Sequence, residues 1–168
     1  MFSQGQLLAE ARGWRDQSAR SAAEARARGQ RTAFLCHSHK DQTLVLGLIT
    51  LLHREGWHVY VDWLDASLPD RPNRETARKI KDRIRAADFF LFLATQNAMA
   101  SRWCPWEIGF ADGVKPIDTI FVIPTQDDRG HTHGNEYLDL YRRVEPASPN
   151  GIAAWRPGEI NGVFVRQL

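Results

Sequence analysis

The run Asp88-Phe-Phe-Leu-Phe-Leu-Ala94 decides the fold, because six apolar residues follow the acid without a polar interruption. A strand that is apolar at every position is typical of the centre of a parallel sheet, where helices cover both faces. Just upstream, Asn73 is placed to cap a helix over residues 74–87, in which apolar residues recur at helical spacing. The sequence therefore predicts a helix that leads into a buried central strand.

Further apolar segments extend this pattern to both sides. We expect strands over residues 32–36, 57–61 and 119–123, and a helix over residues 43–52 that ends at Gly56. Strands that alternate with helices indicate an α/β fold, with a central parallel sheet of four to five strands and helices on both faces. Such folds bind their ligands at the carboxyl ends of the strands.

The N-terminal segment differs from the rest in composition. Residues 4–28 are rich in strong helix formers, so we expect a helical extension over residues 1–30, joined at Gly29 to a domain of residues 31–168. The net charge of +2 belongs to this extension, where five arginines stand against three acidic residues. The remaining charges balance, so we expect no nucleic-acid partner.

The C-terminal part has weaker signals. We expect Pro124 to close the fourth strand, since proline lacks the N–H that a strand donates. Beyond it, residues 135–144 favour a short helix, and residues 151–165 favour a last strand. The part of the domain after residue 125 is therefore the least defined by pattern.

The composition indicates the cellular compartment and argues against some kinds of site. The two cysteines, Cys36 and Cys104, lack a CxxC spacing, which is typical of a reducing compartment. No apolar run is long enough for a transmembrane helix, and the N-terminus lacks the apolar core of a signal peptide, so we expect a cytoplasmic protein without a membrane partner. The His-x-His pairs at residues 37–39 and 131–133 have no zinc-site spacing, and we expect no metal.

The helix after the central strand carries a carboxylate in aromatic surroundings. In Ser101-Arg-Trp-Cys-Pro-Trp-Glu-Ile-Gly-Phe-Ala111, Ser101 is placed to cap the helix and Pro105 falls in its tolerant first turn. Trp103 precedes Glu107 by four residues, so both side chains share one helix face. A carboxylate held against an indole loses hydration, which makes its charged form costly unless it serves a function.

Three motifs together carry a family resemblance. Phe34-Leu-Cys-His-Ser-His-Lys-Asp41 follows a strand, Val59-Tyr-Val-Asp-Trp63 precedes a proline-containing loop, and Ser101 to Glu107 opens a helix. In this order they resemble a Toll/interleukin-1 receptor (TIR) domain, above all the short bacterial TIR-like proteins of the Thoeris anti-phage type. The resemblance spans about residues 31–125. It implies a flavodoxin-like fold and an NAD nucleosidase or cyclase, which cleaves NAD at the nicotinamide–ribose bond.

The resemblance also implies roles for single residues. Glu107 matches the essential glutamate of the family's NAD-cleaving members, on the helix after the third strand. The residues expected to bind the substrate are Trp103, His37, Ser38, His39, Asp62 and Trp63. Asp62 and Trp63 have an equally simple structural explanation. An aspartate after a strand commonly forms a turn, and a tryptophan in a loop commonly packs against its neighbours.

Cleavage of the nicotinamide–ribose bond of NAD is compatible with a single carboxylate in the site. Nicotinamide leaves NAD without the help of an acid, because its positive charge is already in place. The ribose then develops oxocarbenium character, which a carboxylate stabilises electrostatically. NAD is thus the substrate, and no separate cofactor is needed. Water as acceptor gives ADP-ribose, attack from within the same molecule gives a cyclic ADP-ribose isomer, and a free imidazole gives a conjugate.

The resemblance implies partners as well. Residues 62–73 match the loop through which TIR domains assemble, although here it has two prolines and no glycine after the first, which predicts a stiffer loop. We therefore expect homo-oligomers through TIR–TIR contacts. A small domain without a fused effector resembles the half of an anti-phage system that produces a signal for a separate effector protein.

Two other function classes stay open. A non-catalytic TIR adaptor would act by homotypic assembly, although such adaptors commonly lack the glutamate. A nucleoside deoxyribosyltransferase-like enzyme would act on another N-glycosidic bond on a related fold. For Glu107 itself the simplest alternative is a structural one, in which the carboxylate pairs with an arginine such as Arg102 or is solvated.

Overall fold

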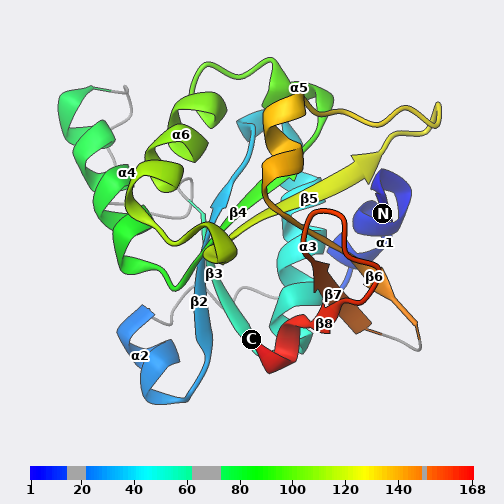
Figure 1. Ribbon diagram of the computed structural model, residues 1–168, viewed down its shortest axis with the longest axis horizontal. Helices are drawn as coiled ribbons and strands as arrows, with labels where there is room; N and C mark the ends of the chain where they lie inside the picture. The colour runs from blue at the N-terminus through cyan, green and yellow to red at the C-terminus, as the bar shows by residue number, and fades with distance from the viewer. Residues whose placement is uncertain (15–21, 62–72, 149–150) are drawn as a thin grey trace.

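The computed structural model describes residues 1–14, 22–61, 73–148 and 151–168 and confirms the predicted α/β architecture (Figure 1). None of the helices in these ranges combines the length and the apolar character needed to cross a membrane. The elements in chain order are β1 (Phe2–Ser3), α1 (Gln4–Ala11), α2 (Ala22–Ala27), β2 (Arg31–Cys36), η1 (His39–Asp41), α3 (Gln42–Arg54), β3 (Trp57–Tyr60), α4 (Arg74–Ala86), β4 (Phe89–Ala94), α5 (Gln96–Met99), α6 (Cys104–Val114), η3 (Ile117–Thr119), β5 (Ile120–Gln126), η4 (Glu136–Leu140), β6 (Arg142–Ala147), β7 (Gly151–Trp155), β8 (Val163–Phe164) and η5 (Val165–Gln167).

The sheet has a parallel half and an antiparallel half. Its order is β3-β2-β4-β5-β6-β7-β8, and β1 pairs separately with β5. The strands from β3 to β6 are parallel to one another, whereas β7 and β8 add antiparallel strands at one edge. The parallel part has the strand order of a flavodoxin-like fold. The predicted parallel core is therefore confirmed, and the antiparallel edge extends it.

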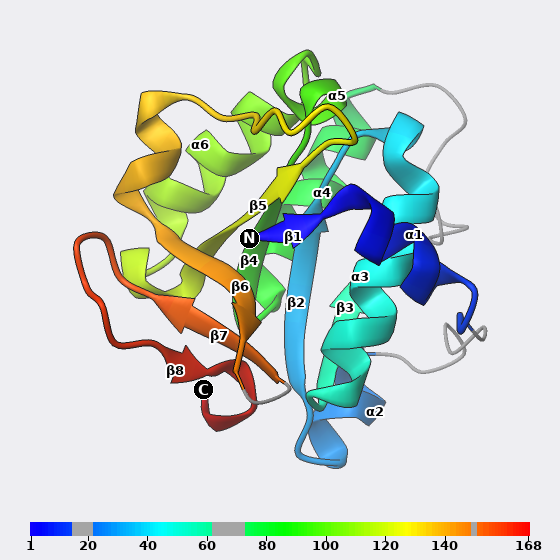
Figure 2. The ribbon, with the colours of Figure 1, turned by 90° about the vertical axis from the view of Figure 1, so that its right-hand side faces the viewer.

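Helices cover the sheet on both faces, as the continuous apolar run of β4 predicts. Phe90 and Phe92 of β4 pack in one core with residues of α4 and α6. Leu91 and Leu93 pack in the other core with residues of α1 and α3. Figures 1 and 2 show the two helical layers on opposite sides of the sheet. Both cores are thus built by alternate residues of the same strand.

The ends of two helices follow the predicted signals. The side chain of Asn73 accepts hydrogen bonds from the backbone N–H groups of Glu75 and Thr76 at 2.8 and 3.1 Å, which caps α4. Gly56 follows α3 with φ of 86°, a conformation that favours glycine. Both boundaries are confirmed because they depend on local chemistry.

The N-terminal segment packs into the domain. The described residues do not form one helix from 4 to 28, because α1 ends at Ala11 and a turn follows around Gly13, a weak helix former. Phe2 pairs with Thr125 of β5 and is 1% exposed, and Leu7 on α1 is fully buried. The division of the chain at residue 30 stays a prediction, but the first residues contribute to the core.

The fourth strand does not end at Pro124. β5 continues to Gln126, because the proline falls between the residues that pair with β6 and the two residues that pair with β1. On its other edge β5 stays paired with β4, where Pro124 is in register with Ala94. Further on, the helix expected over residues 135–144 is only the 3-10 turn η4, because residues 142–144 belong to strand β6. The expected last strand is the pair β7 and β8.

Candidate functional site

Two loops meet where the order of the parallel strands changes direction. β2 lies between β3 and β4, so the connection that leaves β2 and the one that leaves β4 run to opposite sides. In open α/β sheets this switch point, at the carboxyl ends of the strands, is where ligands bind. Residues 37–41 follow β2 and Thr95 follows β4, so these two segments form the candidate site.

The first loop holds its histidines in a defined arrangement. His37 is buried, and its Nδ1 donates to the carbonyl oxygen of Leu35 at 2.8 Å. Since a carbonyl only accepts, this bond sets the tautomer, and Nε2 is the acceptor nitrogen of the neutral ring. The rings of His37 and His39 stack with centroids 5.9 Å apart. Ser38 begins the turn η1, where its Oγ accepts from the N–H of Lys40.

A buried aspartate joins this loop to the next one. The carboxylate of Asp41 accepts from the hydroxyl of Thr95 at 2.5 Å and from the side-chain amide of Asn97 at 2.6 Å. Asp41 is 5% exposed and Thr95 is 1% exposed. These are short, charge-assisted hydrogen bonds between the segments that follow β2 and β4.

Helix α6 brings Glu107 to the end of β2. Glu107 lies in the first turn of this helix and is 6% exposed. Cys36, the last residue of β2, donates its thiol to the carbonyl oxygen of Cys104 at 3.8 Å. Burial raises the pKa of the Cys36 thiol well above its usual value, and hydrogen bonds with Cys104 and Glu107 and their charges raise it further. The carboxylate of Glu107 therefore lies close to the end of β2, in a region of low polarity.

Trp103 stands at the start of the same helix. It is half-buried, and its ring meets the ring of Trp106 edge-on, with centroids 5.3 Å apart. Trp106 in turn stacks on Phe110. Ser101 was expected to cap this helix, but its N-cap residue is Trp103, which makes no side-chain capping bond. The hydroxyl of Ser101 instead accepts from the N–H groups of Trp103 and Cys104 at 3.1 and 3.3 Å. These hydrogen bonds hold Trp103 one turn before Glu107.

The predicted site residues thus fall into two groups. Trp103 at the N-cap of α6 and Glu107 in its first turn lie next to the end of β2. His37, Ser38 and His39 extend from this strand end. Asp62 and Trp63 lie outside the described residues, and the roles of all these residues stay predictions. The sequence did not single out Asp41, Thr95 or Asn97, because an aspartate directly before a helix is most simply read as its cap.

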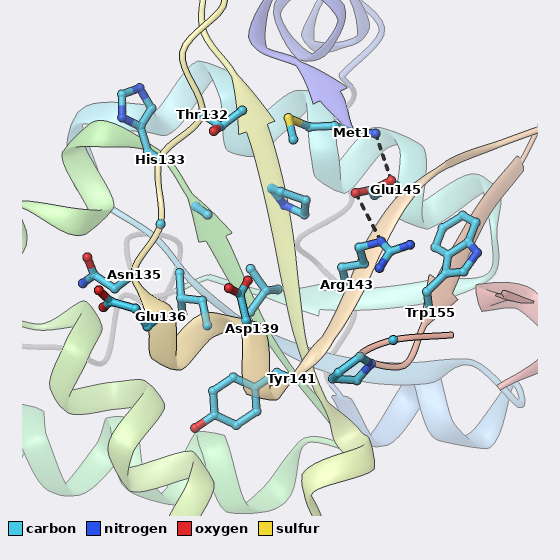
Figure 3. Close-up of a pocket in the computed structure, with 17 residues that line it drawn as sticks. Met1, Thr132, His133, Asn135, Glu136, Asp139, Tyr141, Arg143, Glu145 and Trp155 are labelled. Carbon is cyan, nitrogen blue, oxygen red and sulfur yellow. Dashed lines mark ion pairs between the residues drawn. The ribbon is translucent and has the colours of Figure 1, made fainter. Parts of the chain in front are cut away.

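A separate cavity adjoins β5 and β6. It has a volume of about 710 Å³, and its lining comes mainly from β5, the segment 132–135, η4, β6 and the segment after β7 (Figure 3). Glu145 lines it together with Arg143 and Met1, which pair with its carboxylate at 3.5 and 3.1 Å. None of the predicted site residues is among the described residues that line this cavity.

Tyr141 lies in the wall of this cavity (Figure 3). Loss of solvent raises its pKa to about 12, and a hydrogen bond with Asp112 contributes. Its hydroxyl therefore stays neutral at any ordinary pH. The strand ends near Glu107 stay the candidate site, because the described residues among those predicted for the site lie there.

The two buried acids of the described residues differ in what they can do. Asp41 uses both carboxylate oxygens to accept hydrogen bonds from Thr95 and Asn97. Glu107 lies in the first turn of α6, where the helix dipole favours a negative charge. One ionised carboxylate in a low-polarity site stabilises a cation that develops beside it, but it does not provide the acid–base pair of most glycoside hydrolases.

Comparisons with known proteins agree with this geometry. Residues 33–153 match the family model described as the TIR domain. A relative from Bacillus cereus (strain MSX-D12), ThsB′, named as a 3′ cyclic ADP-D-ribose synthase, is 34% identical over 113 residues, which cover 66% of this chain and 58% of the relative. TIR2 from Cytobacillus dafuensis, named as a cyclic ADP-D-ribose synthase, is 26% identical over 100 residues, which cover 56% of this chain and 25% of the relative. The chain thus spans little more than half of the first relative and a quarter of the second.

Proposed function

Because this chain belongs to the TIR domain family, we propose that it cleaves NAD at the nicotinamide–ribose bond and closes the remaining ADP-ribose into a cyclic product. The observation that carries the proposal is Glu107, an acid with 6% exposure in the first turn of the helix after the third parallel strand. Two relatives that are named as cyclic ADP-D-ribose synthases support the cyclic product.

The reaction starts with the departure of nicotinamide. The bond between C1 of the ribose and the pyridinium nitrogen breaks, and its electron pair goes to nicotinamide, which leaves as a neutral molecule. The ribose becomes an oxocarbenium-like cation, and the carboxylate of Glu107 stabilises it. The N-terminal position of Glu107 in α6 favours the ionised acid that this role requires.

Ring closure completes the reaction. A nucleophilic atom of the same molecule, in its other ribose or its adenine, forms a new bond to C1, and one proton is released. For this the site must exclude water, because water at C1 gives linear ADP-ribose instead. Burial of Glu107 and Asp41 at the strand ends is consistent with such a site.

The product acts on another protein in this proposal. We infer that the chain forms homo-oligomers through TIR–TIR contacts and that its cyclic product activates a separate effector in anti-phage defence. The family membership and the name of the relative ThsB′ support this part.

The test is to incubate the purified protein with NAD and to follow nicotinamide and the nucleotide product by mass spectrometry. We expect nicotinamide together with a cyclic ADP-ribose, and we expect Glu107→Gln to lower the rate by about 10²-fold or more. Glu75→Gln is the matched control, because Glu75 also lies in the first turn of a helix, α4, but is exposed and pairs with Lys79.

Each outcome has a distinct meaning. Linear ADP-ribose as sole product contradicts the cyclisation but leaves NAD cleavage in place. Full activity of the Glu107→Gln variant contradicts the assigned role of the acid. Intact NAD at every protein concentration, with the oligomer present in light scattering, favours the adaptor, and cleavage of nucleosides instead favours the deoxyribosyltransferase class.

A further inference from the structure

The bond between Asp41 and Thr95 crosses the switch point of the sheet. Asp41 ends the loop that follows β2, and Thr95 directly follows β4, so the two residues are 54 positions apart in sequence. β2 and β4 are neighbouring parallel strands, and their carboxyl ends lie side by side. The hydrogen bond therefore links the two segments between which a doubly wound sheet binds its ligand.

Asp41 does not cap its own helix but bonds to the segment after β4 instead. Asp41 occupies the N-cap position of α3, where an aspartate normally accepts a hydrogen bond from the first turn of its own helix. Here its side chain makes no capping bond. Both oxygens instead reach across to Thr95 and Asn97, at 2.5 and 2.6 Å.

The segment after β4 also depends on the hydrogen bond between Asp41 and Thr95. The hydroxyl of Thr95 donates to Asp41 and at the same time accepts from the N–H of Ala98, which caps the short helix α5. Asn97 lies within that helix and donates its amide to Asp41. One carboxylate thus fixes the start of the segment that leads to α6 and Glu107.

We propose that Asp41 is a positioning residue of the active site, which holds the loop of His37, Ser38 and His39 against the segment after β4 by its hydrogen bonds to Thr95 and Asn97. The proposal rests on the proposed function, because that function makes this loop part of the NAD pocket. Loss of the link should loosen residues 37–41 and weaken the binding of NAD, while the strands themselves stay paired.

The molecule contains a matched control at the opposite end of the same strand pair. Asp88, just before β4, accepts from the N–H and the hydroxyl of Thr32 in β2, both at 2.8 Å. This bridge joins the same two strands with the same residue types, but at their amino ends. Asp88→Asn should therefore cost stability without any effect on the site.

The experiment compares Asp41→Asn, Thr95→Val, Thr95→Ser and Asp88→Asn in the full chain. Hydrogen exchange measured by mass spectrometry reports the mobility of residues 37–42, and nicotinamide release from NAD gives kcat and KM. We expect exchange in this segment to rise about tenfold in Asp41→Asn and Thr95→Val. We also expect their kcat/KM to fall about tenfold, mainly through KM.

The remaining variants separate positioning from stability. Thr95→Ser keeps the hydroxyl and should restore both readouts, and Asp88→Asn should melt at a lower temperature with both readouts unchanged. The proposal is overturned by wild-type exchange over residues 37–42 in Asp41→Asn and Thr95→Val, or by an equal rise in Asp88→Asn. It is also overturned if the enzyme is active, Glu107→Gln is inactive, and both link variants keep wild-type kcat/KM. If the unmodified chain releases no nicotinamide, the proposed function fails, and exchange alone decides whether Asp41 holds the loop.

Discussion

The thiol of Cys36 lies against the first turn of helix α6, with its sulfur 3.8 Å from the carbonyl oxygen of Cys104. Cys36 is the last residue of β2, and Cys104 is the first residue of α6. The contact sets how closely the turn that carries Glu107 approaches the strand end. A small, weakly polar side chain suits this place, because it packs against the helix without bringing a charge next to the acid.

The first prediction concerns the reactivity of the two thiols. Both cysteines are buried, and burial, hydrogen bonding and the nearby carboxylate of Glu107 raise the pKa of Cys36 well above its usual value. Since only the thiolate reacts, native protein at about pH 8 should resist iodoacetamide. Mass spectrometry should find two labelled cysteines in denaturant and none in the native state. Rapid native labelling of Cys36 would show that this strand end is open to solvent.

The second prediction concerns Trp103. If its half-buried indole forms part of the NAD pocket, Trp103→Ala should lower kcat/KM for NAD about tenfold, since an aromatic contact is worth about 0.5–1.5 kcal/mol. Trp106→Phe is the control, because Trp106 packs on Phe110 under the ammonium group of Lys81. Steady-state measurement of nicotinamide release compares the two. An equal loss in both variants would assign Trp103 to packing.

The third prediction tests whether the N-terminal helix is part of the domain core. A Cβ atom on Gly47 of α3 would lie 1.9 Å from the carbonyl oxygen of Leu7 in α1, so the two helices touch through their backbones. Gly47→Ala should therefore destabilise the protein by about 1–3 kcal/mol in urea unfolding. Gly113→Ala on α6 meets no neighbour within 4 Å and should instead stabilise it by about 0.5–1 kcal/mol. No loss in Gly47→Ala would mean that α1 moves away freely.

The fourth prediction is a pH dependence of stability. Burial acts to raise the pKa of Asp88, but hydrogen bonds from Thr32 and the charges of Arg26 and Arg31 outweigh it, so the net pKa is lowered. A folded-state pKa below the unfolded value of about 3.9 stabilises the protein above that pH, and this contribution is lost as the pH falls through the folded value. The wild type should therefore exceed Asp88→Asn in unfolding free energy at neutral pH, and the gap should narrow below about pH 4. Urea unfolding at several pH values measures this difference in unfolding free energy. A difference that widens in acid would contradict the lowered pKa of Asp88.

The central elements were predictable because their signals are local. The apolar run of β4, the cap at Asn73 and the terminating Gly56 each act within a few residues of their own position. Ser101 also acts locally, because its hydroxyl accepts from the N–H groups of Trp103 and Cys104, although the N-cap residue of this helix is Trp103. Glu107 itself was found by its motif and its aromatic neighbours.

Features that depend on distant partners were not predictable. The two-residue strand β1 exists only because Phe2 pairs with Thr125, far along the chain. Asp41 has the local pattern of a helix cap, and its actual partners lie 54 and 56 residues further on. Pro124 has the pattern of a strand end, but β5 continues past it, paired with β4 at Pro124 and with β1 directly after it. Pattern alone does not describe such pairings, since each needs the folded sheet.

Aspartate and threonine join β2 and β4 at both ends, by Asp88 with Thr32 at one end and Asp41 with Thr95 at the other. Because these two bridges hold β2 and β4 together at both ends, the two strands should keep their register when the loop after β2 changes in sequence. We therefore expect that residues 37–40 can be exchanged for those of a related domain while Asp41 is retained. The sheet would then serve as a scaffold on which substrate specificity can be changed by loop grafting.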